Sequence, residues 1–242
     1  MKKNEINSNV VAPRKRTKKA EPKTPVVEKV ENDLTEMIFI LDKSGSMSGL
    51  EGDTVGGFNS MIGKQKLEEG DALVTTVLFD TDVTTLHDRV KIGEVPDMTG
   101  RDYVPGGCTA LLDAVGTTVS RISGIRKYLR PEDVPSKTVV VITTDGYENS
   151  SREYTYSSIK KLIGKKREEG WEFIFLGANI DAASTAESIG IDRRRAAKYA
   201  ANSAGTEVKF KAVGAVLCAL RKEEAIAEDW DAEIVETEKK SR

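Results

Sequence analysis

The chain holds 242 residues, and its 37 Lys and Arg residues nearly balance its 39 Asp and Glu residues, which leaves a formal net charge of −2. This balance excludes proteins that bind nucleic acid through an overall cationic surface. Because His87 is the one histidine and the two cysteines form no C-x-x-C pair, the composition also excludes zinc sites with several histidines and a disulfide framework.

The first 33 residues differ in composition from the rest of the chain. They carry nine Lys or Arg residues and five Asp or Glu residues, with few aliphatic side chains. Such a segment buries too little apolar surface to become ordered, so residues 1–33 are predicted to form a disordered basic tail. The basic run at residues 14–19 would allow weak contact with nucleic acid or an acidic partner, but a solvated arm is the simpler interpretation.

The sequence contains no pattern for membrane insertion or secretion. Its longest apolar runs, such as Val139–Ile142, are strand-length and far short of the ~20 residues that a spanning helix needs. The basic amino-terminus lacks the apolar core of a signal peptide. Together with the unpaired cysteines, these features predict a cytoplasmic protein that has no membrane partner.

From Leu34 onward, the sequence alternates between strand and helix patterns. Continuous apolar runs are typical of strands buried on both faces of a parallel sheet, whereas apolar residues spaced by threes and fours are typical of helices. In chain order, the first half predicts a strand at Met37–Leu41, a helix with Val55, Phe58, Met61 and Ile62 on one face, strands at Ala72–Phe79 and Val83–Val90, and a helix with Leu111, Leu112, Val115, Val119 and Ile122. The second half predicts a strand at Lys137–Thr144, a helix with Ile159, Leu162 and Ile163, a strand at Trp171–Ala178, a helix at Ala182–Ile189, a short strand at Arg195–Tyr199 and a helix at Val208–Ile226.

This order of elements predicts an α/β fold. Alternating strands and helices form a doubly wound, mostly parallel central sheet with helices on both faces, the Rossmann-like arrangement. We expect it to occupy residues 34–226 as one domain, with residues 227–242 as a charged and frayed carboxyl-terminal tail.

Three polar loops are expected at the carboxyl-terminal edge of this sheet, where parallel strands end. The first strand ends at Asp42 and continues into Ser44 and Ser46, the second long apolar strand ends at Asp145, and Thr109 follows a glycine pair at the start of a helix. If the two apolar strands are neighbours, the carboxylates of Asp42 and Asp145 meet. Two such charges repel each other unless a cation lies between them.

The donors in these loops are carboxylate and hydroxyl oxygens, without histidine or thiolate. That set favours Mg²⁺, or alternatively Mn²⁺ or Ca²⁺, over Zn²⁺ and Cu²⁺. Two carboxylates and three hydroxyls give at most five side-chain ligands, which is fewer than octahedral Mg²⁺ takes, so one position is predicted to stay open. Each serine alone could be a turn residue or a helix cap, and the metal interpretation depends on the five residues together.

These residues, in this order, resemble the metal-ion-dependent adhesion site of von Willebrand factor type A domains. The resemblance rests on Asp42-x-Ser44-x-Ser46, on Thr109 and on Thr144-Asp145-Gly146, and it covers about Leu34 to Ile191. It implies direct metal ligation by the two serines and the threonine, ligation by the two aspartates directly or through water, and completion by an Asp or Glu of a partner protein. The segment after the site is similar to uncharacterised cytoplasmic bacterial and phage members, and related domains work beside ATPases or in stress or phage complexes.

Three functions are compatible with this site. An exposed, incompletely coordinated cation attracts a carboxylate, so we interpret the chain as a metal-dependent protein-binding module and not as an enzyme; no side chain of the motif is placed as a general base. The alternative is a Mg²⁺-dependent phosphotransferase or phosphatase with Asp42 as nucleophile, although Ser44 stands where a haloacid-dehalogenase-type phosphatase has its acid, and no nucleotide-binding motif is present. The third is a structural component of a larger assembly, stabilised by the metal.

Other residues near the loops receive structural interpretations. Met47 and Cys108 are expected to pack in the interior, because soft sulfur is a poor ligand for a hard cation. His87 lies in a polar strand and is expected at the surface, and Asp113 is expected to face solvent. The pair Gly56–Gly57 is expected to permit the loop shift that the resemblance implies.

Overall fold

The computed structural model describes residues 32–241, so all but the last two residues of the predicted basic tail lie outside the described part of the chain. Six strands form one sheet in the order β3-β2-β1-β4-β5-β6. They are β1 (Thr35–Asp42), β2 (Ala72–Phe79), β3 (Val83–Lys91), β4 (Lys137–Thr144), β5 (Trp171–Gly177) and β6 (Ala196–Lys198). In this sheet β3 alone runs antiparallel to its neighbour, so the sheet is mostly parallel, as predicted.

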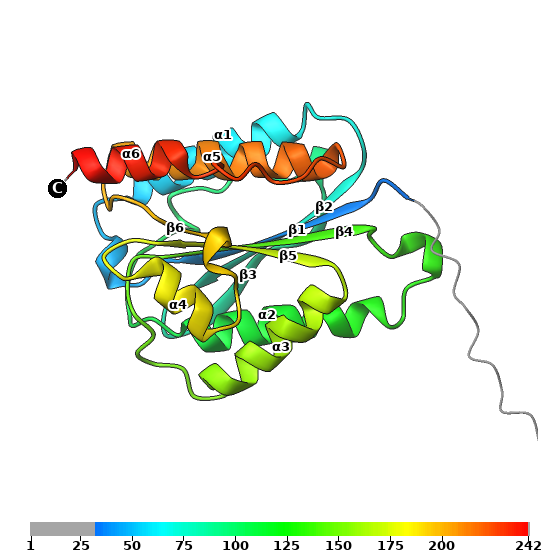
Figure 1. The fold of residues 1–242 in the computed structure, drawn as a ribbon, viewed down its shortest axis with the longest axis horizontal. Helices are drawn as coiled ribbons and strands as arrows, with labels where there is room; N and C mark the ends of the chain where they lie inside the picture. Colours follow the sequence, from blue (N-terminus) through cyan, green and yellow to red (C-terminus); the bar gives the residue numbers. More distant parts are fainter. Residues whose placement is uncertain (1–31, 242) are drawn as a thin grey trace, which may run out of the picture.

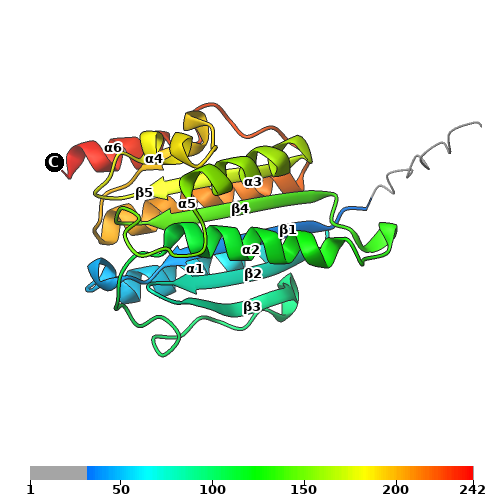
Figure 2. The ribbon, with the colours of Figure 1, turned by 90° about the horizontal axis from the view of Figure 1, so that it is seen from below.

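Helices cover both faces of the sheet (Figures 1 and 2). One face carries α1 (Glu51–Gln65), α5 (Ser203–Arg221) and α6 (Ala232–Lys240), and the other carries α2 (Leu111–Arg126), α3 (Tyr156–Glu168) and α4 (Ala182–Ser188). The connections contain the 3₁₀ helices η1 (Gly45–Met47), η2 (Ile92–Glu94), η3 (Pro131–Asp133) and η4 (Arg193–Arg195). The doubly wound α/β prediction is confirmed. None of the helices within residues 32–241 combines the length and the apolar character that crossing a membrane requires.

Strand β1 lies between β2 and β4 and is buried along its whole length. Met37, Phe39 and Leu41 belong to the core beneath α1 and α5, whereas Ile38 and Ile40 belong to the core beneath α2 and α3. Burial on both faces explains the continuous apolar run. Because β1 and β4 pair in parallel, their carboxyl ends lie side by side, which is the arrangement that the expected metal site needs.

The carboxyl-terminal segment is folded, although the sequence predicted a frayed tail. Residues Ala232–Lys240 form α6, which packs against α5 (Figure 1). Ile234 is 1% exposed and joins the core, and Trp230 Nε1 donates to the Arg194 carbonyl at 2.9 Å. The expectation of a frayed end is wrong because one short apolar face was hidden among many charged residues.

His87 is buried, although the sequence predicted a surface position. It is 2% exposed, and its ring stacks on Phe58 of α1 with the centroids 6.2 Å apart. Its Nδ1 lies 3.0 Å from the hydroxyl of Thr76. The prediction is wrong because β3 is an edge strand, whose mostly exposed positions gave it a polar composition.

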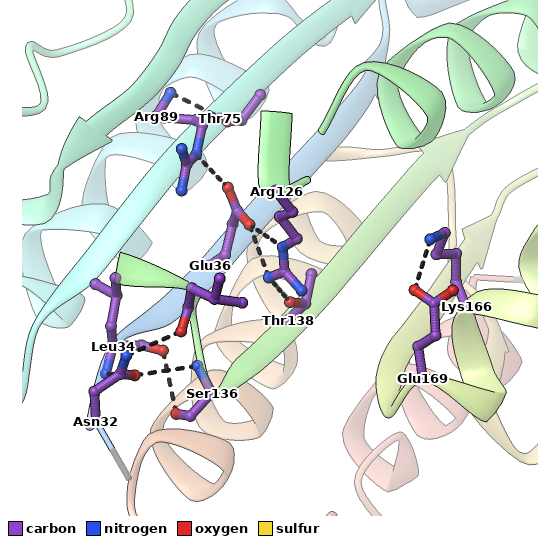
Figure 3. Close-up of polar contacts among 11 residues, drawn as sticks. Asn32, Leu34, Glu36, Thr75, Arg89, Arg126, Ser136, Thr138, Lys166 and Glu169 are labelled. Carbon is purple, nitrogen blue, oxygen red and sulfur yellow. Dashed lines mark hydrogen bonds and ion pairs between the residues drawn. The ribbon is translucent and has the colours of Figure 1, made fainter. Parts of the chain in front are cut away.

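A buried charge network lies at the opposite end of β1 from Asp42 (Figure 3). Glu36 is fully buried between two arginines, with Arg89 Nε 2.6 Å from one carboxylate oxygen and Arg126 Nη2 2.8 Å from the other. The Arg126 guanidinium also lies over the Trp171 ring, 4.7 Å from its centroid. The sheet therefore has one polar end at which the buried carboxylate is fully paired and, at its carboxyl edge, a second polar end.

Candidate metal centre

Asp42 is held in a fixed position at the end of β1. It is 1% exposed, its Oδ1 accepts a hydrogen bond from the Ser44 amide at 2.7 Å, and its Oδ2 accepts one from the Thr144 hydroxyl at 2.6 Å. The first bond is a local turn in which an aspartate caps the amide two residues later. The second bond ties the carboxyl ends of β1 and β4 together. The first bond explains the D-x-S spacing, and the second explains why Asp42 lies beside the end of β4.

Ser46 brings the first loop to Asp145. Its hydroxyl donates to Asp145 Oδ1 at 2.6 Å and lies 3.2 Å from the hydroxyl oxygen of Ser44. Asp145 and Ser44 are buried, whereas Ser46 is exposed. The cluster of oxygen atoms therefore opens to solvent on the side of Ser46.

Thr109 joins the cluster from the third loop. This loop lies along the loop after β1, and the Gly106 amide donates to the Lys43 carbonyl at 2.9 Å. A Cβ placed on Gly146 would lie 3.5 Å from Thr109 Oγ1 and 3.9 Å from Ser46 Oγ, so both hydroxyls border the backbone of Gly146. The structure thus brings all five sequence-predicted side chains to one edge of the sheet.

The electrostatics and the donor set of this cluster suit a cation. Burial raises the pKa of Asp42, hydrogen bonds from Ser44 and Thr144 oppose that rise, and the Asp145 carboxylate adds to it. A divalent ion would offset both the burial and the repulsion, and hard oxygen donors fit Mg²⁺, Mn²⁺ or Ca²⁺. Within residues 32–241, no group of three or more His, Cys, Asp and Glu side chains is arranged to hold a metal, so such a site needs hydroxyl ligands.

Two carboxylates tie the loop after Asp145 to α2. Glu148 Oε2 accepts from the Leu112 amide at 2.9 Å, at the start of the helix, and Asp113 Oδ1 accepts from the Tyr154 amide at 2.8 Å. The expectation that Asp113 faces solvent is therefore wrong. Sequence reasoning missed both roles because the accepted amides come from distant parts of the chain.

Asn149 holds the backbone of Thr109 at two points. Its Oδ1 accepts from the Thr109 amide at 2.8 Å, and its own amide donates to the Thr109 carbonyl at 3.0 Å. These bonds fix the residue that carries the third hydroxyl of the cluster. In the sequence, Asn149 was marked only by its position four residues after Asp145.

The neighbouring sulfur and amine groups differ in their surroundings. Met47 is 1% exposed and packs in the core, as predicted. Cys108 is exposed, so its predicted packing is wrong; the positive φ of Gly107 turns the loop, and Cys108 donates its amide to Thr81 Oγ1 at 2.9 Å. The Lys43 ammonium is paired with the Asp80 carboxylate.

A layer of polar side chains lies buried behind the cluster, and sequence analysis missed it. The Tyr103 hydroxyl donates to the Asp42 carbonyl. Tyr199 is 1% exposed and Lys209 is fully buried. Burial lowers the pKa of Lys209 to about 7, while the Asp145 and Asp42 carboxylates act to raise it. The available signal was the position of Lys209 on the apolar stripe of its helix, four residues before Val213.

No protein-family model matches the sequence, and no curated protein matches it as a relative. Solved structures do share its fold. Proximal thread matrix protein 1 from the mussel byssus is 16% identical, with a TM-score of 0.56, and the match covers 76% of this chain and 46% of that one. The von Willebrand factor domain of the pilus tip protein Mfa5 from Porphyromonas gingivalis is 10% identical, with a TM-score of 0.57 over 80% of this chain and 98% of that one.

A second structure of the mussel protein, 17% identical with a TM-score of 0.52 over 76% of this chain and 46% of that one, has a zinc-occupied metal-ion-dependent adhesion site. The match spans about half the length of the mussel protein. These likenesses show that the chain has the von Willebrand factor type A fold.

Proposed function

We propose that the chain is a protein-binding module that captures an acidic side chain of its partner through a divalent metal ion. The observation that carries this proposal is the meeting of two buried carboxylates and three hydroxyls at a solvent-open edge of the sheet. In this proposal Ser44, Ser46 and Thr109 ligate the ion directly, and Asp42 and Asp145 ligate it directly or through water.

Mg²⁺ is the proposed ion, with Mn²⁺ and Ca²⁺ as alternatives of the same hard-oxygen class. Bound there, the ion supplies an incompletely neutralised positive charge that attracts an anionic oxygen. The chain's own residues orient the ligands: the Ser44 amide and the Thr144 hydroxyl fix Asp42, and Asn149 fixes Thr109. The open side at Ser46 leaves room for an external carboxylate.

The contacts of the candidate catalytic groups favour binding over the phosphotransferase alternative. Both carboxylate oxygens of Asp42 already accept hydrogen bonds, and the residue is 1% exposed, which makes it a poor nucleophile. Lys43 is paired with Asp80. His87 is buried against α1 and is therefore not available as a base at the cluster.

The partner that we propose is a protein presenting Asp or Glu, such as an ATPase or a member of a stress or phage complex, in the cytoplasm of a bacterium or phage host. Val104 and Tyr147 lie in the loops that border the cluster and are 59% and 57% exposed. They would contact the residues next to the captured carboxylate. Nucleic acid would be at most a weak partner of the basic tail.

The decisive test compares Ser46→Ala with Ser48→Ala, an exposed serine of the same loop outside the oxygen cluster. Calorimetry with Mg²⁺ and Mn²⁺ is expected to show binding by the wild type and Ser48→Ala, and at least about tenfold weaker binding by Ser46→Ala. Capture of a protein from a lysate of the source cells should then follow the same order and be lost in EDTA. Equal capture with and without EDTA would contradict the proposal, and metal binding without any captured protein would favour the assembly component.

A further inference from the structure

Lys209 is a buried amine that has no hydrogen-bonding partner in the part of the chain that the structure describes. It lies in α5, on the face of the sheet that this helix covers (Figure 1), and is 0% exposed. Its Nζ is buried and donates no hydrogen bond to any of the described residues. Lysines at helix surfaces normally extend their ammonium group to water. Lys209 does not, so its charge depends on the groups that surround it in the interior.

Aromatic rings provide part of that environment. The Nζ atom lies 4.2 Å from the centroid of the Tyr199 ring and 5.1 Å from that of Phe210. The attraction between a cation and an aromatic face is weaker than the penalty for burying an ion, so the rings alone do not account for the position.

Two carboxylates provide the rest. The ring that Lys209 covers belongs to Tyr199, whose amide donates to the Gly177 carbonyl at 3.0 Å. Gly177 pairs across β5 and β4 with Thr144, which precedes Asp145 and donates its hydroxyl to Asp42. Asp145 and Asp42 are accordingly the charged groups that favour the protonated form of Lys209. Tyr199, on the segment after β6, also interacts with both carboxylates, and its buried hydroxyl has no hydrogen-bond partner among the described residues. One buried positive charge therefore stands behind two buried negative ones.

We propose that Lys209 is an internal counter-cation of the Asp42 and Asp145 carboxylates, which partly offsets their negative charge in the metal-free site and lowers the affinity of the site for divalent cations. This inference rests on the proposed metal site. The ammonium group and a divalent ion compete for the same pair of negative charges from opposite sides. Metal and partner bind cooperatively, because the partner's carboxylate ligates the ion. When the affinity of the site alone for the ion is lower, metal binding depends more on that carboxylate.

The test replaces Lys209 with methionine, which keeps the length of the side chain and removes its charge. Lys211→Met is the matched control, because Lys211 lies two residues away on the same helix, is exposed and pairs with Glu233 at 2.7 Å. Both variants lose one positive charge. Mg²⁺ and Mn²⁺ affinities are measured by calorimetry at pH 6.5, below the pKa of Lys209, with circular dichroism to verify folding.

Lys209→Met is expected to bind both ions at least about tenfold more tightly than the wild type, because an opposing charge inside the protein is only weakly screened. Lys211→Met should stay within about threefold, as expected of an exposed, screened charge. If Lys209→Met does not fold, Lys209→Gln takes its place under the same criterion.

Affinity within about threefold of the wild type in the Lys209 variant would overturn the proposed counter-cation role. The proposed metal site would stand in that case if Ser46→Ala still weakens metal binding at least about tenfold. An equal gain in both lysine variants would also overturn it, because the effect would then belong to net charge. Absence of metal binding by the wild type itself would overturn the proposed site and this inference together.

Discussion

At the residue scale, the lysine behind the cluster has a consequence for stability that does not depend on any metal. Burial lowers the pKa of Lys209 to about 7, whereas the pKa of a lysine in the unfolded chain is about 10.4. Between these values the unfolded chain holds a proton that the folded chain has released. This residue therefore makes the fold more stable as pH rises from about 7 to about 10.

We predict that Lys209→Met removes this part of the pH dependence. The variant should be more stable than the wild type at pH 6, by up to about 4 kcal/mol, and the two should converge toward pH 10. Urea unfolding at several pH values measures the difference, with Lys211→Met as the control that should follow the wild type. If the free energy of unfolding changed with pH in the same way in Lys209→Met and in the wild type, burial would not disfavour the protonated form of Lys209.

A second prediction at this scale concerns Asn149, whose two hydrogen bonds fix Thr109. Asn149→Ala leaves the Thr109 amide without its partner, so the hydroxyl is less well oriented. Groups that support metal ligands typically contribute ten- to a hundredfold in affinity, and we expect about a tenfold loss in Mg²⁺ affinity by calorimetry. Ser150→Ala is the control, because that buried hydroxyl makes no hydrogen bond within residues 32–241. Unchanged affinity in Asn149→Ala would mean that Thr109 is positioned by other contacts.

The residues that could be predicted from the sequence are those whose spacing is local. Asp42 and Ser44 are linked by a turn of two residues, so their arrangement follows from the motif. Asn149 and Lys209 act on groups far away in the chain, and nothing in their immediate neighbours marks those contacts. Lys209 at a core position of an apolar stripe was a detectable conflict, since a charge there has to find a partner or pay for its burial.

At the element scale, α1 and α5 approach closely because of one glycine. A Cβ on Gly57 would lie 2.5 Å from Phe210 Cδ2, whereas a Cβ on Gly56 would meet nothing within 4 Å. Gly57 therefore permits the contact between the helices. The expectation that the pair provides loop mobility stays a prediction, but packing already explains one of its two members.

The matched substitutions Gly57→Ala and Gly56→Ala test this directly. Gly57→Ala should destabilise the chain by about 1–3 kcal/mol, because the added methyl group forces Phe210 or the helix to move. Gly56→Ala should be neutral or stabilising by up to about 1 kcal/mol, as expected for alanine in an open helix position. Chemical denaturation gives both values. Equal effects would mean that the helices separate easily and that the close contact is not needed.

Elements were predictable where their pattern was unbroken. The buried strands β1 and β4 have continuous apolar runs, which the sequence shows without ambiguity. Helix α6 was missed because Ile234 and its few apolar neighbours stand among charged residues. This short apolar face is buried only by packing against α5. Such an element depends on a surface that exists only after the rest of the chain has folded.

At the scale of the whole molecule, the sheet separates two polar ends with different balances of charge. At the carboxyl edge, the side chains of Asp42 and Asp145 are countered only partly, which is what a cation site requires. At the other end, Glu36 is matched by Arg89 and Arg126 (Figure 3). Asp42 lies six positions after Glu36 in β1, a span of roughly 20 Å for an extended strand. At that distance, a substitution at Glu36 should change the stability of the fold without changing the affinity of the metal site.

We therefore predict that Glu36→Gln weakens the fold and leaves the metal site unchanged. The substitution leaves two arginines beside a neutral side chain in the interior, which should lower the free energy of unfolding by about 3–5 kcal/mol. Glu172→Gln is the control, because Glu172 is 43% exposed at its side chain and its oxygen lies 3.6 Å from Arg195 Nε, a contact that contributes little. Mg²⁺ affinity of folded Glu36→Gln should stay within about twofold of the wild type, as expected for independent sites. A tenfold weaker affinity would instead show that β1 transmits strain from one end of the sheet to the other, and that the cluster at the carboxyl edge depends on the packing of the whole strand.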